Sequence, residues 1–235
     1  MPQNEKGRLY LVSTPIGNLG DITYRSVEIL RTVALIAAED TRRTKILLNH
    51  YEITTPLAIY NSYNKDRKGP DYIRKILKGD DVALVSDAGT PGVSDPLYHL
   101  VQLALEEELE VVPIPGPSAV LSALTVSGLP MDRFRFEGFL PRKKRRKKTI
   151  EALAEQSATV VLFESPMRID KTLHELRDAF GNRPAALARE LTKMHEEVIR
   201  GGLDDLCRIS EGRKWKGEIT LVLSGNKPIK SNKES

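Results

Sequence analysis

Residues 82–96 read VALVSDAGTPGVSDP, and the predicted fold depends on the pattern in this stretch. A short apolar run is followed at once by a loop of glycine, proline and small hydroxyl side chains. A run that is apolar on both faces is typical of a strand buried in a parallel sheet, and glycine and proline end such a run. We therefore predict a strand at Val82–Asp87 with a loop at its carboxyl end.

Similar strands occur throughout the first half of the chain and alternate with helical stretches. Amphipathic helices are indicated at Ile22–Thr32 and Leu97–Glu108, with a further helix at Thr41–Tyr51. Alternation of this kind indicates βαβ units and a mostly parallel sheet with helices on both faces. The other strands expected in this half are Leu9–Thr14, Ala34–Glu39, Pro56–Tyr60 and Val111–Pro115.

The second half has a different pattern, which begins after the turn at Ser127–Pro130. We predict an N-terminal α/β domain over residues 1–126 and a C-terminal mixed α/β domain over residues 127–235. Strands Ala185–Glu190 and Glu196–Arg200 are so close in sequence that an antiparallel hairpin is expected. The other elements expected here are strands Arg135–Phe139, Thr159–Ser165 and Glu218–Leu223 and helices Thr149–Gln156, Arg168–Phe180 and Leu203–Ser210.

The composition excludes several classes of protein. Of the 235 residues, 40% are hydrophobic and 29% are charged, which is typical of a globular protein rather than a disordered one. The longest apolar run, Val33–Ala38, is too short to span a bilayer, and the first residues lack the pattern of a secretory signal. The single cysteine, Cys207, can form neither an internal disulfide nor a CxxC zinc site. We therefore expect a cytoplasmic protein that holds no metal.

The positive charge is concentrated in one segment. Residues 142–148 read RKKRRKK, whereas the whole chain carries a net charge of +4, so the remainder carries 4 − 7 = −3. The protein is thus a mildly acidic body with one basic run, which we define as residues 142–148. A patch of this kind indicates a polyanionic partner.

The motifs of several common enzyme classes are missing. The chain has no GxSxG elbow, no GxxxxGK[ST] phosphate loop and no GxGxxG fingerprint. Its four histidines, His50, His99, His174 and His195, show no metal-binding spacing. The usual signatures of hydrolases, NTPases and dehydrogenases are therefore absent.

Three loops dense in glycine, proline and hydroxyl residues follow predicted strands. They are residues 13–21, 87–96 and 115–119. Ligands of open parallel sheets bind outside the carboxyl ends of the strands, where glycine lets the backbone approach a ligand closely. Turn chemistry explains any one of these loops, but three at one sheet edge favour a ligand site.

The same loops carry a resemblance to a known family. The sequence resembles the tetrapyrrole methylase superfamily, and within it the branch that methylates small-subunit ribosomal RNA. The match runs in order from about Leu9 to Leu223. The motifs that carry it are TPIGNLGD (14–21), AEDTR (38–42), SDAGTPGVSDP (86–96), PGPSA (115–119), FESPMR (163–168) and ARELTK (188–193).

The resemblance implies both an activity and a fold. The implied activity is transfer of a methyl group from S-adenosylmethionine to the ribose 2′-oxygen of a decoding-centre cytidine in 16S rRNA. The implied fold has two α/β domains with the cofactor in the cleft between them, in a homodimer. Matched motif by motif, the cofactor would contact Pro15, Ile16, Gly89, Thr90, Val93, Ser118 and Ala119 in the first domain and Phe163, Ala188 and Thr220 in the second.

Asp40 has two interpretations. It directly follows a predicted strand and precedes a predicted helix, which is the usual place of an N-cap. Its position in AEDTR also makes it a candidate catalytic carboxylate that faces the substrate. In that case Arg42 and Arg43 are candidates for contacts with RNA phosphates.

Glu190 and Lys193 of ARELTK are the other catalytic candidates. They could form an ordinary surface ion pair, or one of them could share the proton of the ribose hydroxyl. A hydroxyl is a poor nucleophile until a base takes part of its proton, and alignment of the reacting atoms supplies much of the rate. The residues alone do not select one base.

The basic run predicts RNA contact. Its cations Arg142, Lys143, Lys144, Arg145, Arg146, Lys147 and Lys148 crowd the start of a predicted helix, where the helix dipole disfavours positive charge. Binding of a polyanion would offset that cost. Two alternatives are a solvated surface and a stretch whose cations pair with acidic groups of the fold.

Two further functions stay open at this point. One is a methylase that acts on a small tetrapyrrole, for which a run of seven cations is not needed. The other is a non-enzymatic RNA-binding or assembly module with a degenerate cofactor fold.

Overall fold

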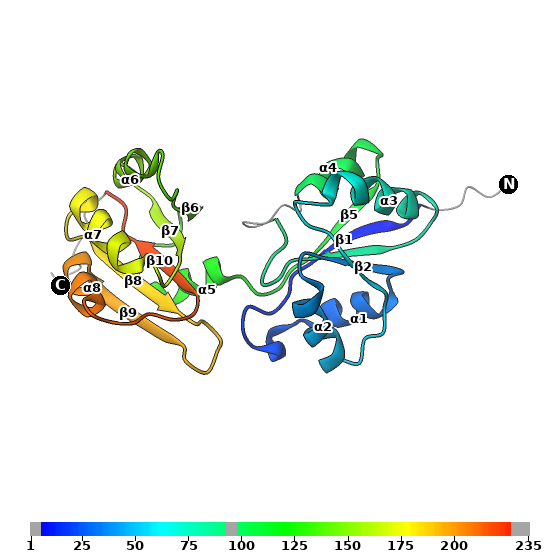
Figure 1. The fold of residues 1–235 in the computed structure, drawn as a ribbon, viewed down its shortest axis with the longest axis horizontal. Coiled ribbons are helices and arrows are strands. Elements are labelled where there is room, and N and C mark those ends of the chain that lie inside the picture. The colour runs from blue at the N-terminus through cyan, green and yellow to red at the C-terminus, as the bar shows by residue number, and fades with distance from the viewer. Residues whose placement is uncertain (1–5, 93–97, 227–235) are drawn as a thin grey trace, which may run out of the picture. The chain divides into compact units, whose positions relative to one another are not determined.

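The computed structural model describes residues 6–92 and 98–226. The chain forms two compact units, residues 1–118 and residues 119–235 (Figure 1). Each unit contains one five-stranded sheet with its own hydrophobic core. None of the helices in the described part of the chain combines the length and apolar character needed to cross a membrane.

The sheet of the first unit is entirely parallel. Its strands lie in the order β3-β2-β4-β1-β5, so that β1, β4 and β5 are neighbours. Strands β2 and β4 are buried along their whole length, which explains their uninterrupted apolar sequence. The strands are β1 (Arg8–Val12), β2 (Leu35–Ala38), β3 (Leu57–Ile59), β4 (Val82–Val85) and β5 (Glu110–Ile114).

Helices cover both faces of this sheet. On one face α1 (Tyr24–Thr32) and α2 (Thr41–His50) contribute to one apolar cluster, and on the other α3 (Lys65–Leu77) and α4 (Tyr98–Glu106) contribute to a second. A short 3₁₀ helix, η1 (Leu19–Asp21), precedes α1. The prediction of a mostly parallel sheet with helices on both faces is confirmed.

Helix α3 was not predicted. Its sequence, KDRKGPDYIRKIL, contains Gly69 and Pro70, which discourage a helix. Tyr72, Ile73 and Ile76 are nevertheless buried against the sheet. Burial of this apolar stripe outweighs the unfavourable propensity of the first turns.

The sheet of the second unit is mixed. Its strands lie in the order β6-β7-β10-β8-β9; β6 and β7 are parallel, and the other neighbours are antiparallel. The predicted hairpin is confirmed as β8 and β9. The strands are β6 (Phe134–Phe139), β7 (Thr159–Glu164), β8 (Pro184–Arg189), β9 (Glu197–Gly202) and β10 (Ile219–Leu223).

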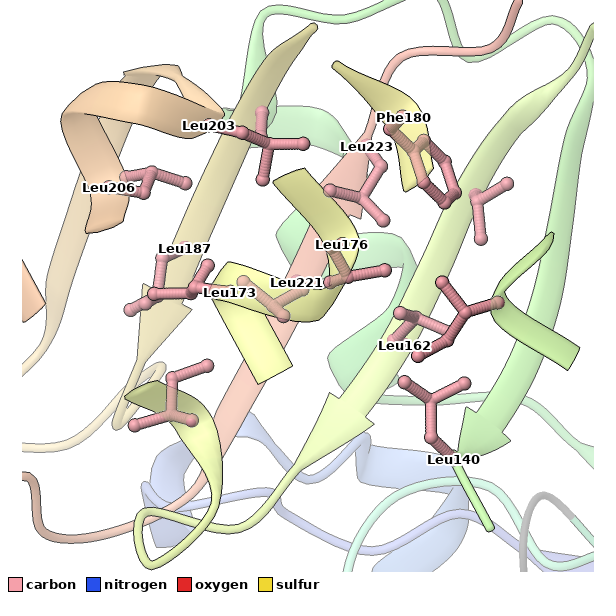
Figure 2. Close-up of a cluster of buried hydrophobic side chains, with 14 of the residues drawn as sticks. Leu140, Leu162, Leu173, Leu176, Phe180, Leu187, Leu203, Leu206, Leu221 and Leu223 are labelled. Carbon is pink, nitrogen blue, oxygen red and sulfur yellow. The ribbon is translucent and has the colours of Figure 1, made fainter. Parts of the chain in front are cut away.

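Three helices pack on this sheet around a leucine-rich core. Helices α6 (Arg146–Ala154), α7 (Ile169–Phe180) and α8 (Leu203–Ser210) enclose this cluster with β7, β8 and β10. Figure 2 shows Leu173 and Leu176 of α7 together with Leu162, Leu187 and Leu221 of these strands. A core of this size holds the sheet rigid beneath the loops that follow its strands.

Two helices of the second unit differ from expectation. Helix α5 (Ala119–Ser127) was not predicted; its contacts are with β8, β9 and β10 of the second unit. The division after residue 126 stays a prediction, and it would assign nearly all of α5 to the first domain. Helix α6 starts at Arg146 instead of Thr149, so it includes the last three residues of the basic run.

Candidate functional site

The structure brings the three glycine- and proline-rich loops of the first unit together. Thr14 and Gly89 form a two-way backbone bridge, with N···O distances of 2.9 and 3.0 Å. The Ser13 hydroxyl donates to Thr90 Oγ1 at 3.3 Å, and the Thr90 hydroxyl donates to the Pro117 carbonyl at 3.4 Å. One residue from each loop thus joins a continuous network at the carboxyl ends of β1, β4 and β5.

Two glycines let these loops approach one another. Gly89 has a φ of +85°, and a Cβ there would lie 3.4 Å from Ile16 Cγ2 and 3.6 Å from the Pro117 oxygen. A Cβ on Gly116 would lie only 2.9 Å from Cβ of Ser13. A larger residue at either position would disturb the shape of the loops.

The other predicted cofactor residues of this unit lie in the same loops. Pro15 and Ile16 follow the bridge residue Thr14, and Ser118 follows Pro117. Ala119 comes next in the chain, but it is the first residue of α5 and belongs to the second unit. Val93 lies outside the described residues. The closely spaced backbone and hydroxyl groups form a cradle suited to a small polar molecule.

The predicted cofactor residues of the second unit form a row across the sheet. Thr220 of β10 is the register partner of Phe163 on β7 and of Ala188 on β8. Residues directly opposite one another point to the same face of a sheet, and here that face is opposite to the one that carries Leu162, Leu187 and Leu221. Phe163 also makes an edge contact with Phe136, with ring centroids 4.9 Å apart.

Asp40 is the N-cap of α2. Its carboxylate accepts the backbone N–H of Arg42 at 2.9 Å and also binds the guanidinium of Arg42 through two oxygens, at 3.0 and 2.7 Å. The hydrogen bonds from Arg42 lower the pKa of this carboxyl to about 2. The N-cap interpretation is confirmed, while the catalytic role stays a prediction.

Asp87 is a site residue that the sequence analysis did not single out. Its carboxylate accepts the backbone N–H of Asp40 at 2.9 Å and lies 3.9 Å from Nε of Arg43. Asp87 therefore connects the end of β4 to the start of α2 and orients Asp40. The sequence signal that could have identified Asp87 is its place in SDAGTPG, at the end of a predicted strand.

Glu190 and Lys193 form an ion pair that includes Glu218. Nζ of Lys193 lies 2.8 Å from Glu190 Oε1 and 3.1 Å from Glu218 Oε2. Burial raises the pKa of the Glu190 carboxyl, but hydrogen bonds from Lys193 and the Glu218 backbone outweigh it, so the net pKa is lowered. Burial lowers the pKa of Lys193, and its two carboxylate partners reverse this, so the net pKa is raised. Lys193 is therefore held as an ammonium ion and cannot accept a proton.

The backbone around this pair is strained. Glu190 and Thr192 have φ values of 52° and 67°, which non-glycine residues rarely adopt. Gly217 has a φ of +86°, and a Cβ there would clash with the side chain of Glu190, so a larger residue would strain the backbone and displace Glu190. Strain of this kind is common at functional sites.

The basic run contains two kinds of cation. Six are exposed: Arg142, Lys143, Lys144, Arg145, Lys147 and Lys148. Arg146 is buried, and its guanidinium donates to Glu175 at 2.7 Å, to Thr172 Oγ1 at 2.7 Å and to the Pro141 carbonyl at 3.2 Å. Arg146 therefore pairs with acidic groups of the fold, and its guanidinium is not available to a phosphate.

The buried carboxylate of Glu164 completes this network. It accepts the Thr172 hydroxyl at 2.7 Å and lies 2.6 Å from Arg168 and 3.8 Å from Arg146. A buried carboxylate needs such partners because burial of an unpaired charge is costly. The network attaches the end of the basic run to β7 and α7.

Comparison with known proteins identifies the family. A model of the Tetrapyrrole (Corrin/Porphyrin) Methylases matches residues 8–207. The ribosomal RNA small subunit methyltransferase I of Thermotoga maritima is 47% identical over 219 residues, which are 93% of this chain and 99% of that protein. This chain belongs to the ribosomal RNA small subunit methyltransferase I branch of the tetrapyrrole methylase family.

Further relatives and solved structures agree with this assignment. The protein of the same name from Halalkalibacterium halodurans is 46% identical over 95% of this chain and 78% of that protein. A crystal structure of diphthine synthase has a TM-score of 0.72 at 18% identity, covering 93% of this chain and 90% of that one. A uroporphyrin-III-C-methyltransferase from Thermus thermophilus has a TM-score of 0.67 at 19% identity, covering 93% and 94%. At these identities the structures show a shared fold.

Family membership confirms the motif-based resemblance and the cofactor. The chain is an S-adenosylmethionine-dependent methyltransferase of this branch. The loops of the first unit fit such a cofactor because the left-handed Gly89 leaves space between Ile16 and Pro117 that a side chain would fill. The individual cofactor and catalytic residues stay predictions.

Proposed function

We propose that this protein transfers a methyl group from S-adenosylmethionine to the ribose 2′-oxygen of a cytidine in 16S rRNA of the small ribosomal subunit. The observation that carries this proposal is the 44–49% identity to ribosomal RNA small subunit methyltransferases I over nearly the whole chain. The motifs that support it lie in both compact units.

In this proposal the cofactor-binding residues form two sets, one in the three loops and one in the row on the second sheet. Pro15, Ile16, Gly89, Thr90, Val93, Ser118 and Ala119 belong to the loops, and Phe163, Ala188 and Thr220 to the sheet. The network of Ser13, Thr90 and Pro117 supports the loop part, because it fixes the backbone groups before a ligand binds. The bound cofactor supplies an electrophilic methyl group on a positively charged sulfur.

The protein's own residues then orient the ribose hydroxyl and take up its proton. Lys193 cannot act as the base because its raised pKa keeps it protonated, but its ammonium can hold a carboxylate or a phosphate in place. Glu190 and Asp40 are ionised at neutral pH and can accept a hydrogen bond from the hydroxyl. Their lowered pKa values make them weak bases, so orientation of the reacting oxygen contributes more to the rate than proton abstraction does.

The RNA is bound by the six exposed cations of the basic run and by Arg42 and Arg43. The concentration of these cations in an otherwise acidic chain supports this assignment. Arg146 has no part in it because its guanidinium is bound within the second unit.

We also propose that the protein acts as a homodimer in the cytoplasm. The family resemblance supports the dimer, and the ribosomal substrate supports the location. Sedimentation equilibrium of the purified chain tests the dimer, because a monomer mass at micromolar concentration would contradict it.

The test is methyl transfer from radiolabelled S-adenosylmethionine. Small ribosomal subunits, free 16S rRNA and a porphyrin are offered in parallel, and labelled RNA is digested to nucleosides. We expect label in 2′-O-methylcytidine from the ribosomal substrate. Label only in the porphyrin would support the tetrapyrrole alternative, and cofactor binding without transfer would support a non-enzymatic module.

A further inference from the structure

A cavity of about 390 Å³ lies beside α2 in the first unit, outside the three cofactor loops. It is bounded by α2 and by residues 53–57, which lead into β3. Its volume is at the lower end of the range for small-molecule sites. Of the described residues assigned a role in the proposed function, Arg42 is the one that lines it.

The cavity has an apolar floor and a polar rim. Leu48 and Ile53 on the floor are 3% and 6% exposed. Asn49 and Thr54 on the rim are exposed and offer an amide and a hydroxyl. A flat heterocycle with hydrogen-bonding edges suits such a lining.

The two charged side chains among the described residues that line the cavity are cations, and one of them, Arg42, is paired with the carboxylate of Asp40. The cavity's lining includes Arg42 and Lys45, and none of the described residues that line it carries a carboxylate. Nε and Nη2 of Arg42 donate to Asp40, so that side chain is held at one end of the cavity. Lys45 is exposed and offers its ammonium to an anion.

The polar groups follow a single stripe along α2. Thr41, Lys45 and Asn49 are four residues apart, so they lie on one side of the helix. The stripe starts beside the N-cap Asp40, the catalytic candidate. A chain that occupies the cavity would therefore pass close to Asp40.

We propose that this cavity binds one nucleotide of the substrate RNA close to the target cytidine. The base lies over Leu48 and Ile53 with its edge at Asn49, and Lys45 binds the phosphate. Splayed-out bases of single-stranded RNA are recognised by contacts of this kind. A free nucleotide has the same base and phosphate groups as a nucleotide of RNA. The statement that the nucleotide belongs to RNA therefore rests on the proposed function.

Titration of the full chain with cytidine 5′-monophosphate, followed by NMR, tests the site without any methyl transfer. We expect shifts confined to α2 and residues 53–57 in the parent chain. Asn49→Trp should abolish them by filling the cavity, and Lys45→Ala should weaken binding about fivefold, the effect of one exposed ion pair. Lys75→Ala is the matched control, because Lys75 is an exposed lysine on α3, which covers the other face of the sheet. It should change nothing.

The source of the nucleotide is tested with small ribosomal subunits. Lys45→Ala should raise the KM for subunits about fivefold, with kcat and cofactor affinity kept. Nucleotide shifts without a change in this KM would overturn the RNA assignment and leave a free-nucleotide site. Absence of nucleotide shifts near α2 would overturn the site itself. Failure of the parent chain to methylate ribosomal RNA would refute the proposed function while leaving the titration result intact.

Discussion

Gly89 shows how a single residue shapes the candidate site. Its φ is positive, so any side chain there strains the backbone. A Cβ at this position would also lie 3.4 Å from Ile16 Cγ2 and would fill part of the cradle. Gly212 also has a positive φ, of +69°, but no atom lies within 4 Å of its hypothetical Cβ. A substitution at Gly212 therefore causes backbone strain alone, whereas a substitution at Gly89 causes the same strain and also fills space beside the loops.

We expect Gly89→Ala and Gly212→Ala to lower stability by a similar amount, about 1–2 kcal/mol each. Only Gly89→Ala should weaken binding of S-adenosylmethionine. Urea denaturation and calorimetric titration measure the two effects. Equal cofactor affinity in both variants and the parent would contradict the placement of the cofactor beside Gly89.

The pH dependence of methyl transfer tests the proposed base. A base acts in its ionised form, and the lowered pKa values of Glu190 and Asp40 keep both carboxylates ionised well below neutral pH. The single-turnover rate should therefore be constant from about pH 8 to about pH 5. A fall in rate with a midpoint between about pH 6 and 7 would indicate a different base.

At the scale of elements, Arg146 determines how α6 begins. The cations of the basic run are unfavourable at a helix N-terminus, and Arg145, the residue before α6, has a φ of 67°. Arg146 offsets these costs because Glu164, Glu175 and Thr172 bind its guanidinium. The start of the helix is thereby attached to the core of the second unit.

Arg146→Ala should destabilise the protein by about 1–3 kcal/mol, because Glu175 and Thr172 lose their hydrogen bonds to the guanidinium while Glu164 keeps Arg168. Lys147→Ala is the matched control: Lys147 is 92% exposed and lies 3.9 Å from Glu151. Its effect should stay within about 0.5 kcal/mol. Urea denaturation measures both, and equal stabilities would show that the Arg146 network contributes little.

At the scale of the whole molecule, our proposal assigns RNA binding to the exposed cations of the basic run and cofactor binding to other residues. We expect a variant with Arg142, Lys143, Lys144, Arg145, Lys147 and Lys148 changed to Ser to bind RNA more weakly. The slope of log affinity against log salt should decrease by up to about 0.7 for each phosphate that the variant no longer neutralises. The affinity for S-adenosylmethionine should not change.

This variant keeps Arg146, so it should be at least as stable as the parent. Filter binding at several salt concentrations gives the slope, and thermal unfolding gives the stability. A slope equal to that of the parent would show that the run is inert surface. A lower melting temperature would show that further cations of the run pair with acidic groups.

The sequence alone determined the strands, the hairpin and the three loops of the first unit. These features depend on local patterns: short apolar runs specify buried strands, and clusters of glycine and proline specify where they end. The motifs that identified the family are also local, because each of them is a contiguous stretch of sequence and they follow one another in a fixed order. The N-cap role of Asp40 was also visible because it involves residues only two positions apart.

Only the tertiary structure decided the burial of Arg146, the formation of α3 and the alignment of Phe163, Thr220 and Ala188. Arg146 is bound by partners far along the chain, so within its run it looks like the other cations. Helix α3 forms against its local propensity because Tyr72, Ile73 and Ile76 are buried. The alignment of the three residues depends on strand register, which is set by packing of one whole face of the sheet on the core.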